Sequence, residues 1–278
     1  MTLSPYAWLA IDPTMEPPAS RDNEYDHFAD IYSVWTDTAS SARANLAFYV
    51  EAYTAADGPV VELGVGDGRI AIPAAARGRH ITGVDLSTAM LDRCRRKAEE
   101  SGVSDRLTLL QADFRHFQLD EPAALISLPY HSLGHVTAID EKRAVVEHVF
   151  AQLRPGGRFL FDDFLMTPAA VNHMRGVQLR ATYQSASGAD VRLWVTSIVD
   201  ESAQSIRVVT WEDERSGDEW LSDRRYRYLT LSWLSPAQAR QLLTDAGFLV
   251  DASYGDFEGT PFAESTAHEQ VWVARRPG

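Results

Sequence analysis

The 278-residue sequence lacks several features that would define a protein class. Its only cysteine, Cys94, excludes an internal disulfide and more plausibly lies passively in a helix than acts as a nucleophile. No apolar run approaches the ~18 residues of a membrane-spanning helix, and the N-terminus has no charged-then-apolar layout of a signal peptide. Lys and Arg number 26 against 39 Asp and Glu, a net charge of −13. We therefore expect neither a nucleic-acid partner nor a membrane partner.

The remaining composition is that of a globular protein, with 45% hydrophobic and 23% charged residues. The length can bury a full core, either as one large domain with an insertion or as two domains. With neither a signal-peptide layout nor a membrane-spanning run, a cytoplasmic protein is the default expectation. We expect a monomer or a homodimer.

The most informative stretch runs from Val60 to Arg69 and reads VVELGVGDGR. A short apolar strand ends beside a carboxylate, the turn contains Gly64, Gly66 and Gly68, and a helical pattern follows. Glycine adopts positive φ and lets a ligand approach the backbone closely. A dinucleotide fingerprint would need a glycine where Arg69 stands, and no Gly-Lys-Ser/Thr follows for a phosphate-binding loop. We infer an adenosine-bearing ligand that is not held by phosphates.

Acidic residues follow the next two predicted strands. Asp85 ends the strand expected at 80–85, about 20 residues after Gly64, where a carboxylate can accept hydrogen bonds from both ribose hydroxyls. The alternative role of helix N-cap can be filled by Ser87. Asp113 and Phe114 follow the strand expected at 107–111, although an Asp in a turn is common without any ligand.

Together these residues resemble the motifs of class I S-adenosylmethionine-dependent methyltransferases. The sequence Leu-Arg-Pro-Gly-Gly at 153–157 and the Ala-Gly-Phe at 246–248 extend the resemblance over nearly all of the chain beyond residue 24. Tyr25, Ala29 and Tyr32 match a segment that closes over the cofactor in amino-sugar N,N-dimethyltransferases and glycine N-methyltransferase. The spacing of Tyr25, Tyr32 and neighbouring aromatic residues equally fits an amphipathic helix packed on the core.

The resemblance implies that S-adenosyl-L-methionine is the cofactor. In addition to the three glycines of the turn, Asp85, Asp113 and Phe114, it implies cofactor contacts from Tyr25, Tyr32, Glu62, Leu86, Met90 and Leu128. Arg43 could pair with the methionine carboxylate of the cofactor, or it could be a solvated charge on a helix.

The resemblance also implies an α/β fold: a Rossmann-like seven-stranded, mostly parallel sheet with helices on both faces, plus a small antiparallel β insertion after strand five. Periodicity predicts helices at 69–77, 87–101, 140–153 and 235–246, and strands at 59–63, 124–128, 158–162, 248–254 and 269–275, with a turn at 154–157. Four antiparallel strands are expected between 179 and 231. The expected domains are an N-terminal arm at 1–24, a cofactor-binding domain at 25–164 and 233–278, and an inserted subdomain at 165–232.

The loop after the fourth strand contains the candidate catalytic residues Tyr130 and His131. Methyl transfer from a sulfonium is an in-line displacement, so the protein mainly holds the reactants collinear and excludes water. We expect His131 to act as a base or an orienting group, and Tyr130 to orient the acceptor or shield the sulfonium. His135 is expected to be structural. The spacing of the two histidines could suggest a metal pair, but no acid follows at ligand spacing, so we expect no metal.

The leading hypothesis is a methyltransferase acting on a small-molecule amine, an amino sugar or an amino acid derivative of a secondary-metabolite pathway. Relatives that act on sugar amines often carry Phe-Asn/Arg-Ser where this chain has Tyr130-His131-Ser132, so the acceptor stays open. Asp163 could pair with a substrate ammonium or cap a turn. The alternatives are an O- or C-methyltransferase of a natural product and a protein that binds the cofactor without catalysis. A nicotinamide dehydrogenase is disfavoured by Arg69.

Overall fold

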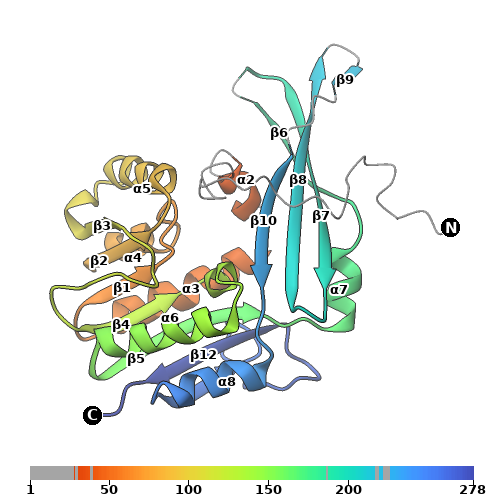
Figure 1. Ribbon diagram of the computed structural model, residues 1–278. Helices are drawn as coiled ribbons and strands as arrows, with labels where there is room; N and C mark the ends of the chain where they lie inside the picture. The colour runs from red at the N-terminus through yellow and green to blue at the C-terminus, as the bar shows by residue number, and fades with distance from the viewer. Residues whose placement is uncertain (1–27, 29–30, 38–39, 186, 217–218, 222–225) are drawn as a thin grey trace.

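The computed structural model describes residues 28–278, apart from 29–30, 38–39, 186, 217–218 and 222–225. Two sheets dominate the described chain (Figure 1). The larger has seven strands in the order β11-β12-β5-β4-β1-β2-β3, and the smaller has the order β10-β8-β7-β6, with the short β9 paired to β8. The expected α/β architecture with an added antiparallel sheet is confirmed. The predicted arm at 1–24 lies outside the described residues.

The larger sheet alternates strands with helices along the chain. Strands β1 to β5 are mutually parallel, whereas β12 is antiparallel to β5 and β11 is antiparallel to β12. The strands are β1 (Val60–Leu63), β2 (Ile81–Asp85), β3 (Leu107–Gln111), β4 (Ala123–Leu128), β5 (Leu153–Phe164), β11 (Leu249–Tyr254) and β12 (Glu269–Arg275). The helices are α3 (Ser40–Ala55), α4 (Ala71–Ala76), α5 (Thr88–Glu100), α6 (Ile139–Gln152) and α8 (Pro236–Asp245), with 3₁₀ turns η2 (Ser104–Arg106) and η3 (Ser132–His135).

Local sequence signals explain the ends of the helices. Ser87 is the N-cap of α5, and its hydroxyl accepts a hydrogen bond from the Met90 N–H at 3.1 Å. Ser235 and Gln238 form a capping box at the start of α8. Helix α4 is shorter than the predicted 69–77, because residues 69–70 belong to the preceding turn. Pro73 therefore falls in the first turn of α4, where its missing N–H removes no helical hydrogen bond.

The predicted turn at 154–157 is instead part of β5, which begins at Leu153. The Gly156 N–H donates to the carbonyl of Arg276 at 3.0 Å, and the Arg276 N–H donates to the carbonyl of Gly157 at 2.8 Å. On the opposite side the pairing with β4 shifts register between Ala123 and Leu125. The glycines therefore form a bulged start of the strand, held by the C-terminal segment.

Helices cover both faces of the larger sheet, as expected. On one face, Val145 and Val149 of α6 and Leu242 of α8 pack in a core with sheet residues that include Leu63 and Phe159. On the other face, residues of α3, α4 and α5 pack against the sheet: Tyr49, Tyr53, Ala71, Ala74 and Leu91. The sheet is thus the middle layer of three.

The smaller sheet extends beyond the larger one, with α2 (Tyr32–Asp37) beside it (Figure 1). Its strands are β6 (Gln178–Gln184), β7 (Asp190–Asp200), β8 (Ser205–Ser216), β9 (Glu219–Leu221) and β10 (Arg227–Ser232). They are preceded by a helix that the sequence analysis did not predict, α7 (Pro168–Met174), which is capped by Thr167. All of these elements fall within the expected insertion, and we propose 165–232 as its bounds.

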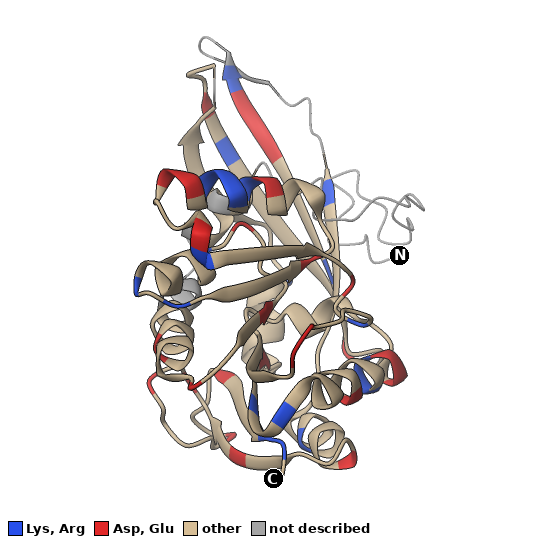
Figure 2. Ribbon diagram, turned by 90° about the vertical axis from the view of Figure 1, so that its left-hand side faces the viewer, with Lys and Arg blue, Asp and Glu red and all other residues tan. Residues whose placement is uncertain are grey.

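Acidic and basic residues are interspersed along the described elements, as Figure 2 shows. Among these same residues, no helix is long and apolar enough to cross a bilayer.

Candidate active site

A cavity of about 290 Å³ opens at the carboxyl ends of β1, β2 and β4. From β1 the chain proceeds to β2 and β3 on one side, whereas β4 and β5 lie on the other, so this is the switch point where ligands bind in open α/β sheets. Most of the expected cofactor residues line this cavity: Tyr32, Glu62, Gly64, Gly66, Asp85, Leu86, Met90, Asp113 and Phe114.

Two glycines form a cradle whose width depends on the absence of side chains. Gly64 has φ +67° and Gly66 has φ +56°, a region that favours glycine. A Cβ at 64 would lie 3.0 Å from the Ser132 Oγ, and a Cβ at 66 would lie 3.3 Å from the Met90 Cε. Gly68 differs, because a Cβ there would lie 2.7 Å from the Cys94 Sγ. Gly68 therefore permits packing under the turn and does not line the cavity.

The Asp85 carboxylate joins the glycine turn to the start of α5. One oxygen accepts a hydrogen bond from the Gly66 N–H at 2.8 Å, and the other accepts from the Ser87 N–H at 2.8 Å. A carboxylate oxygen can accept more than one hydrogen bond, so these two backbone bonds do not preclude bonds from hydroxyls of a ligand. Its position on the cavity wall fits the expected ribose contact.

Glu62 is a buried acid at the end of β1, with 2% of its surface exposed. Burial raises the pKa of its carboxyl to about 8, although the charge of Arg69 and a hydrogen bond from Tyr53 oppose the rise. Its Oε2 is buried with no hydrogen-bond partner. An unsatisfied acid on a cavity wall fits a ligand that brings an ammonium group, as the methionine part of the expected cofactor would.

Three other expected cofactor residues differ from those above in their position or their contacts. Leu128 is fully buried in the core at the end of β4 and does not line this cavity. Tyr25 lies outside the described residues. Asp113 is already engaged by Arg115, whose guanidinium donates to both carboxylate oxygens at 2.6–3.0 Å. Although burial opposes the shift, these bonds lower the pKa of Asp113. Arg115 itself lines the cavity and was not predicted.

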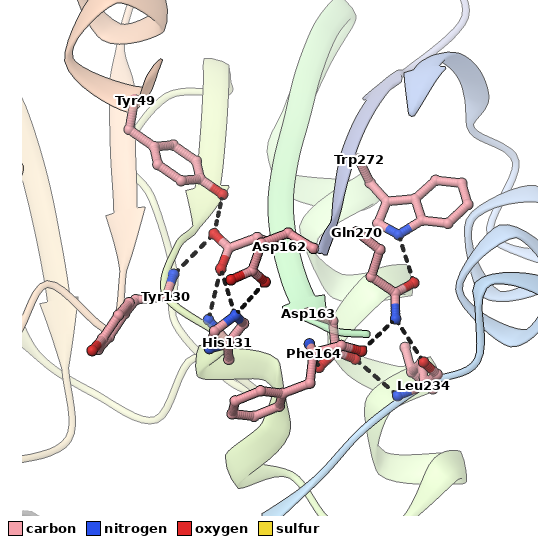
Figure 3. Close-up of polar contacts among 10 residues, drawn as sticks. Tyr49, Tyr130, His131, Asp162, Asp163, Phe164, Leu234, Gln270 and Trp272 are labelled. Atoms are coloured by element: carbon pink, nitrogen blue, oxygen red, sulfur yellow. Dashed lines mark hydrogen bonds and ion pairs between the residues drawn. The ribbon is translucent and has the colours of Figure 1, made fainter. Parts of the chain in front are cut away.

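The loop after β4 has an unusual backbone that is held by one buried acid. Tyr130 and His131 both have left-handed φ angles, +59° and +58°. Their N–H groups donate to the two oxygens of Asp162, at 2.9 Å and 3.0 Å, and the Tyr49 hydroxyl donates to Asp162 at 2.6 Å (Figure 3). Left-handed non-glycine residues cost free energy and persist where the surroundings hold them. Asp162, from β5, compensates that cost here.

His131 is ion-paired rather than poised as a base. Its Nε2 lies 2.9 Å from the Glu269 Oε2 and 3.6 Å from the Asp162 Oδ2, and its ring stacks on Phe164 with a centroid distance of 3.9 Å. Burial lowers the pKa of His131, but these carboxylates and Asp163 outweigh it and raise the pKa to about 9. The imidazole is therefore protonated at neutral pH, which favours the orienting role over the base role.

A second cavity, of about 370 Å³, lies between this loop and the smaller sheet. Tyr130 and His135 line both cavities. Burial, together with the positive charges of Lys142 and His131, lowers the pKa of His135 to about 4, so this imidazole is neutral at neutral pH. The sequence analysis took His135 to be structural, whereas the structure places it where the two cavities meet.

Asp163 and Arg69 are each held by contacts that indicate their roles. Asp163 is fully buried and accepts hydrogen bonds from the N–H groups of Leu234 at 2.9 Å and Phe164 at 2.8 Å, which is the capping alternative (Figure 3). Arg69 lines the first cavity, donates to the Asn45 side chain at 2.9 Å and lies 5.0 Å over the Tyr130 ring. From the sequence, Arg69 served only as evidence against a dinucleotide.

Comparison with known proteins identifies the part of the chain that holds the first cavity. Residues 60–157 match the model of a methyltransferase domain. This segment is a class I S-adenosylmethionine-dependent methyltransferase domain. The family and the cofactor expected from the sequence are thereby confirmed, and the glycine cradle, the unsatisfied Glu62 oxygen and Asp85 suit that cofactor. Among the described residues, no group of three or more His, Cys, Asp and Glu is placed to hold a metal.

Sequence relatives match about half of this chain or less. The chain is 30% identical over 146 residues to the tRNA 5-carboxymethoxyuridine methyltransferase of Escherichia coli, a match that covers 49% of this chain and 54% of that enzyme. The chain thus spans about half the length of these curated relatives.

Solved structures match over nearly the whole chain. The CcbJ methyltransferase from Streptomyces caelestis has a TM-score of 0.74 and 25% identity, over 90% of this chain and 96% of that one. The sugar N-methyltransferase KedS8 from Streptoalloteichus has a TM-score of 0.69 and 17% identity, over 97% and 99%. The second match shows the fold. These alignments include the smaller sheet, so its addition to the methyltransferase domain is shared.

Proposed function

We propose that this protein transfers a methyl group from S-adenosyl-L-methionine to the amine of a small-molecule acceptor, an amino sugar or amino acid derivative of natural-product biosynthesis. The observation that carries the proposal is the meeting of two cavities at Tyr130 and His135. One cavity is built for the cofactor, and the other is large enough for a small acceptor. In-line transfer needs such an arrangement, with donor and acceptor on opposite sides of one narrow junction.

The protonation states at the junction favour an amine over a hydroxyl. A hydroxyl must lose its proton as it attacks, and this needs a base of near-neutral pKa. His131 is already protonated, and His135, with a pKa of about 4, is a weak base. A neutral amine attacks without prior loss of a proton, and the nearby positive charge of His131 keeps an amine in that neutral form.

In this proposal, Tyr32, Met90 and the glycine cradle enclose the cofactor, Glu62 accepts from its ammonium group, and Asp85 accepts from its ribose. The cofactor supplies an activated methyl group. Tyr130, fixed by the left-handed loop, forms the wall between donor and acceptor, and His131 orients the acceptor. Three expectations stay predictions: the acceptor is a small molecule, the protein binds neither nucleic acid nor a membrane, and it is a monomer or a homodimer.

The test is conversion of cofactor to S-adenosylhomocysteine with a panel of amines, each matched by its alcohol. We expect turnover with amines, and His131→Ala should lower kcat at least about tenfold while cofactor affinity stays within about twofold, because the residue acts on the acceptor side. His80→Ala, on the exposed surface, is the control. Turnover confined to alcohols would contradict the amine, and absence of cofactor binding at micromolar protein would contradict the methyltransferase.

A further inference from the structure

We propose that the acceptor carries a carboxylate, bound by Arg180 in the second cavity. The inference rests on the proposed function and selects, between the two acceptor classes named there, the amino acid derivative over the neutral amino sugar.

The charges that face the second cavity are of one sign. Among the described residues that line it, none is Asp or Glu, whereas Arg180 and His131 bring positive charge. His131 is already paired with Glu269 at 2.9 Å. In the described part of the chain, the hydrogen bond and ring contact of the Arg180 side chain are both with Trp35: Nη2 donates to its carbonyl at 2.8 Å, and the guanidinium lies 4.6 Å over its ring. The Arg180 Nε is buried with no hydrogen-bond partner.

The backbone directs Arg180 toward the cavity. The β6–β7 pairing matches Leu179 with Trp194 and then Ala181 with Leu193, so Arg180 is the extra residue of a β-bulge. Bulges re-aim side chains beside binding sites. Gln178 and Arg180 both line the cavity, whereas Leu179 between them is 50% exposed. The bulge thus adds a cation to a wall that is otherwise largely apolar.

A half-buried guanidinium needs a negatively charged partner. Arginine keeps its proton in proteins, so burial removes water without removing the charge. Burial lowers the pKa of Arg180, which reflects this lost hydration. A carboxylate accepts two parallel hydrogen bonds from the guanidinium and brings the negative charge that a hydroxyl or a sugar ring lacks.

The rest of the cavity defines the body and orientation of the acceptor. Its sheet wall consists largely of Val195, Ile206, Val208, Leu229 and Leu231. An apolar body suits this wall, and the volume of about 370 Å³ suits a molecule of modest size. Arg180 and Tyr130 both line this cavity, and Tyr130 also lines the cofactor cavity. A carboxylate on Arg180 would therefore leave the amine of the same molecule in the cavity that meets the methyl donor at Tyr130.

The test compares three probes that differ only in their polar end: 3-phenylpropionate, 3-phenylpropanamide and 3-phenylpropylamine. Calorimetry with the full chain, saturated with S-adenosylhomocysteine, measures binding without turnover. We expect the carboxylate to bind at least tenfold more tightly than the amide. Equal affinity of the two, tighter binding of the amine, or binding of none of the probes at millimolar concentration would overturn the inference.

Substitutions of Arg180 test whether a preference for the carboxylate depends on this residue. Arg180→Gln should lower the affinity for 3-phenylpropionate at least tenfold and leave the affinity for the amide within twofold. Arg180→Lys should retain part of the preference for the carboxylate. Arg175→Gln removes an equal charge from an exposed pair with Glu201 and should behave as the unaltered protein. Unchanged binding of S-adenosylhomocysteine shows that each variant is folded. A carboxylate preference that survives Arg180→Gln would overturn the assignment. A preference without methyl transfer to any amine would overturn only the proposed function.

Discussion

Glu62 is a buried acid that the fold keeps largely protonated in the absence of a bound cation. Its pKa of about 8 follows from burial, and its Oε2 has no partner. An ammonium placed beside it favours the carboxylate, so binding of the cofactor should expel a proton. We predict that calorimetry of S-adenosylhomocysteine at pH 7, in buffers of different ionisation enthalpy, shows proton release of up to about one per ligand.

Glu62→Gln is the matched variant for this proton, because it keeps the shape of the side chain and cannot titrate. Binding to Glu62→Gln should lose the buffer dependence, and a buffer-independent enthalpy in the unaltered protein would contradict the idea. Stability provides a second readout. A raised pKa means that the contribution of Glu62 is complete below its ordinary value of 4.5 and is lost as pH rises through about 8. The variant should lack that loss.

Asp85 is expected to bind the ribose, and the structure adds that it also holds two backbone N–H groups. Asp85→Ala should weaken the binding of S-adenosylhomocysteine by about 1–3 kcal/mol, since buried polar partners lose their acceptor. Asp92→Ala, which removes an exposed carboxylate from the helix that follows Asp85, is the control for net charge. If calorimetry gave the same affinity for Asp85→Ala and the unaltered protein, the ribose assignment would be wrong.

At the scale of the element, the loop after β4 depends on β5. Asp162 is acceptor for two backbone N–H groups and the Tyr49 hydroxyl. Asp162→Asn replaces one acceptor oxygen by a donor, so at least one of these groups loses its partner. We predict a loss of about 1–3 kcal/mol in the free energy of unfolding, measured with urea. The loop geometry should loosen too, and kcat should fall.

Tyr49→Phe is the comparison for Asp162→Asn, because it removes the hydroxyl donor and leaves the loop contacts in place. It should cost only about 1 kcal/mol of stability and leave kcat nearly unchanged. Equal losses of kcat in the two variants would show that Asp162 does not act through the loop.

At the scale of the molecule, one hydrophobic cluster joins the cofactor cavity to the smaller sheet. Met90 and Tyr32, which line that cavity, pack with Leu193 of β7, Ile206 of β8 and Leu229 of β10. Ligand binding should therefore stabilise both sheets. We predict that S-adenosylhomocysteine slows hydrogen exchange at 190–212 as well as at 60–115. Protection confined to 60–115 would show that the smaller sheet opens independently.

Much of the fold could be predicted from the sequence, because its signals are local. The strand ending at Leu63 and the capping of α5 by Ser87 depend on apolar patterns, glycine and a capping hydroxyl within a few residues. Asp85 could be predicted as a ribose ligand for the same reason, since its distance along the chain from Gly64 is a property of the strand-turn-helix unit.

The features that could not be predicted depend on contacts between residues that are distant in sequence. The Asp162 carboxylate meets a loop some 30 residues earlier, and Glu269 sets the protonation of His131 from the far end of the chain. Arg180 is held by Trp35, 145 residues away. The burial and the local charge at such sites depend on many residues that only folding brings together. A helix or strand pattern, in contrast, can be read from consecutive residues.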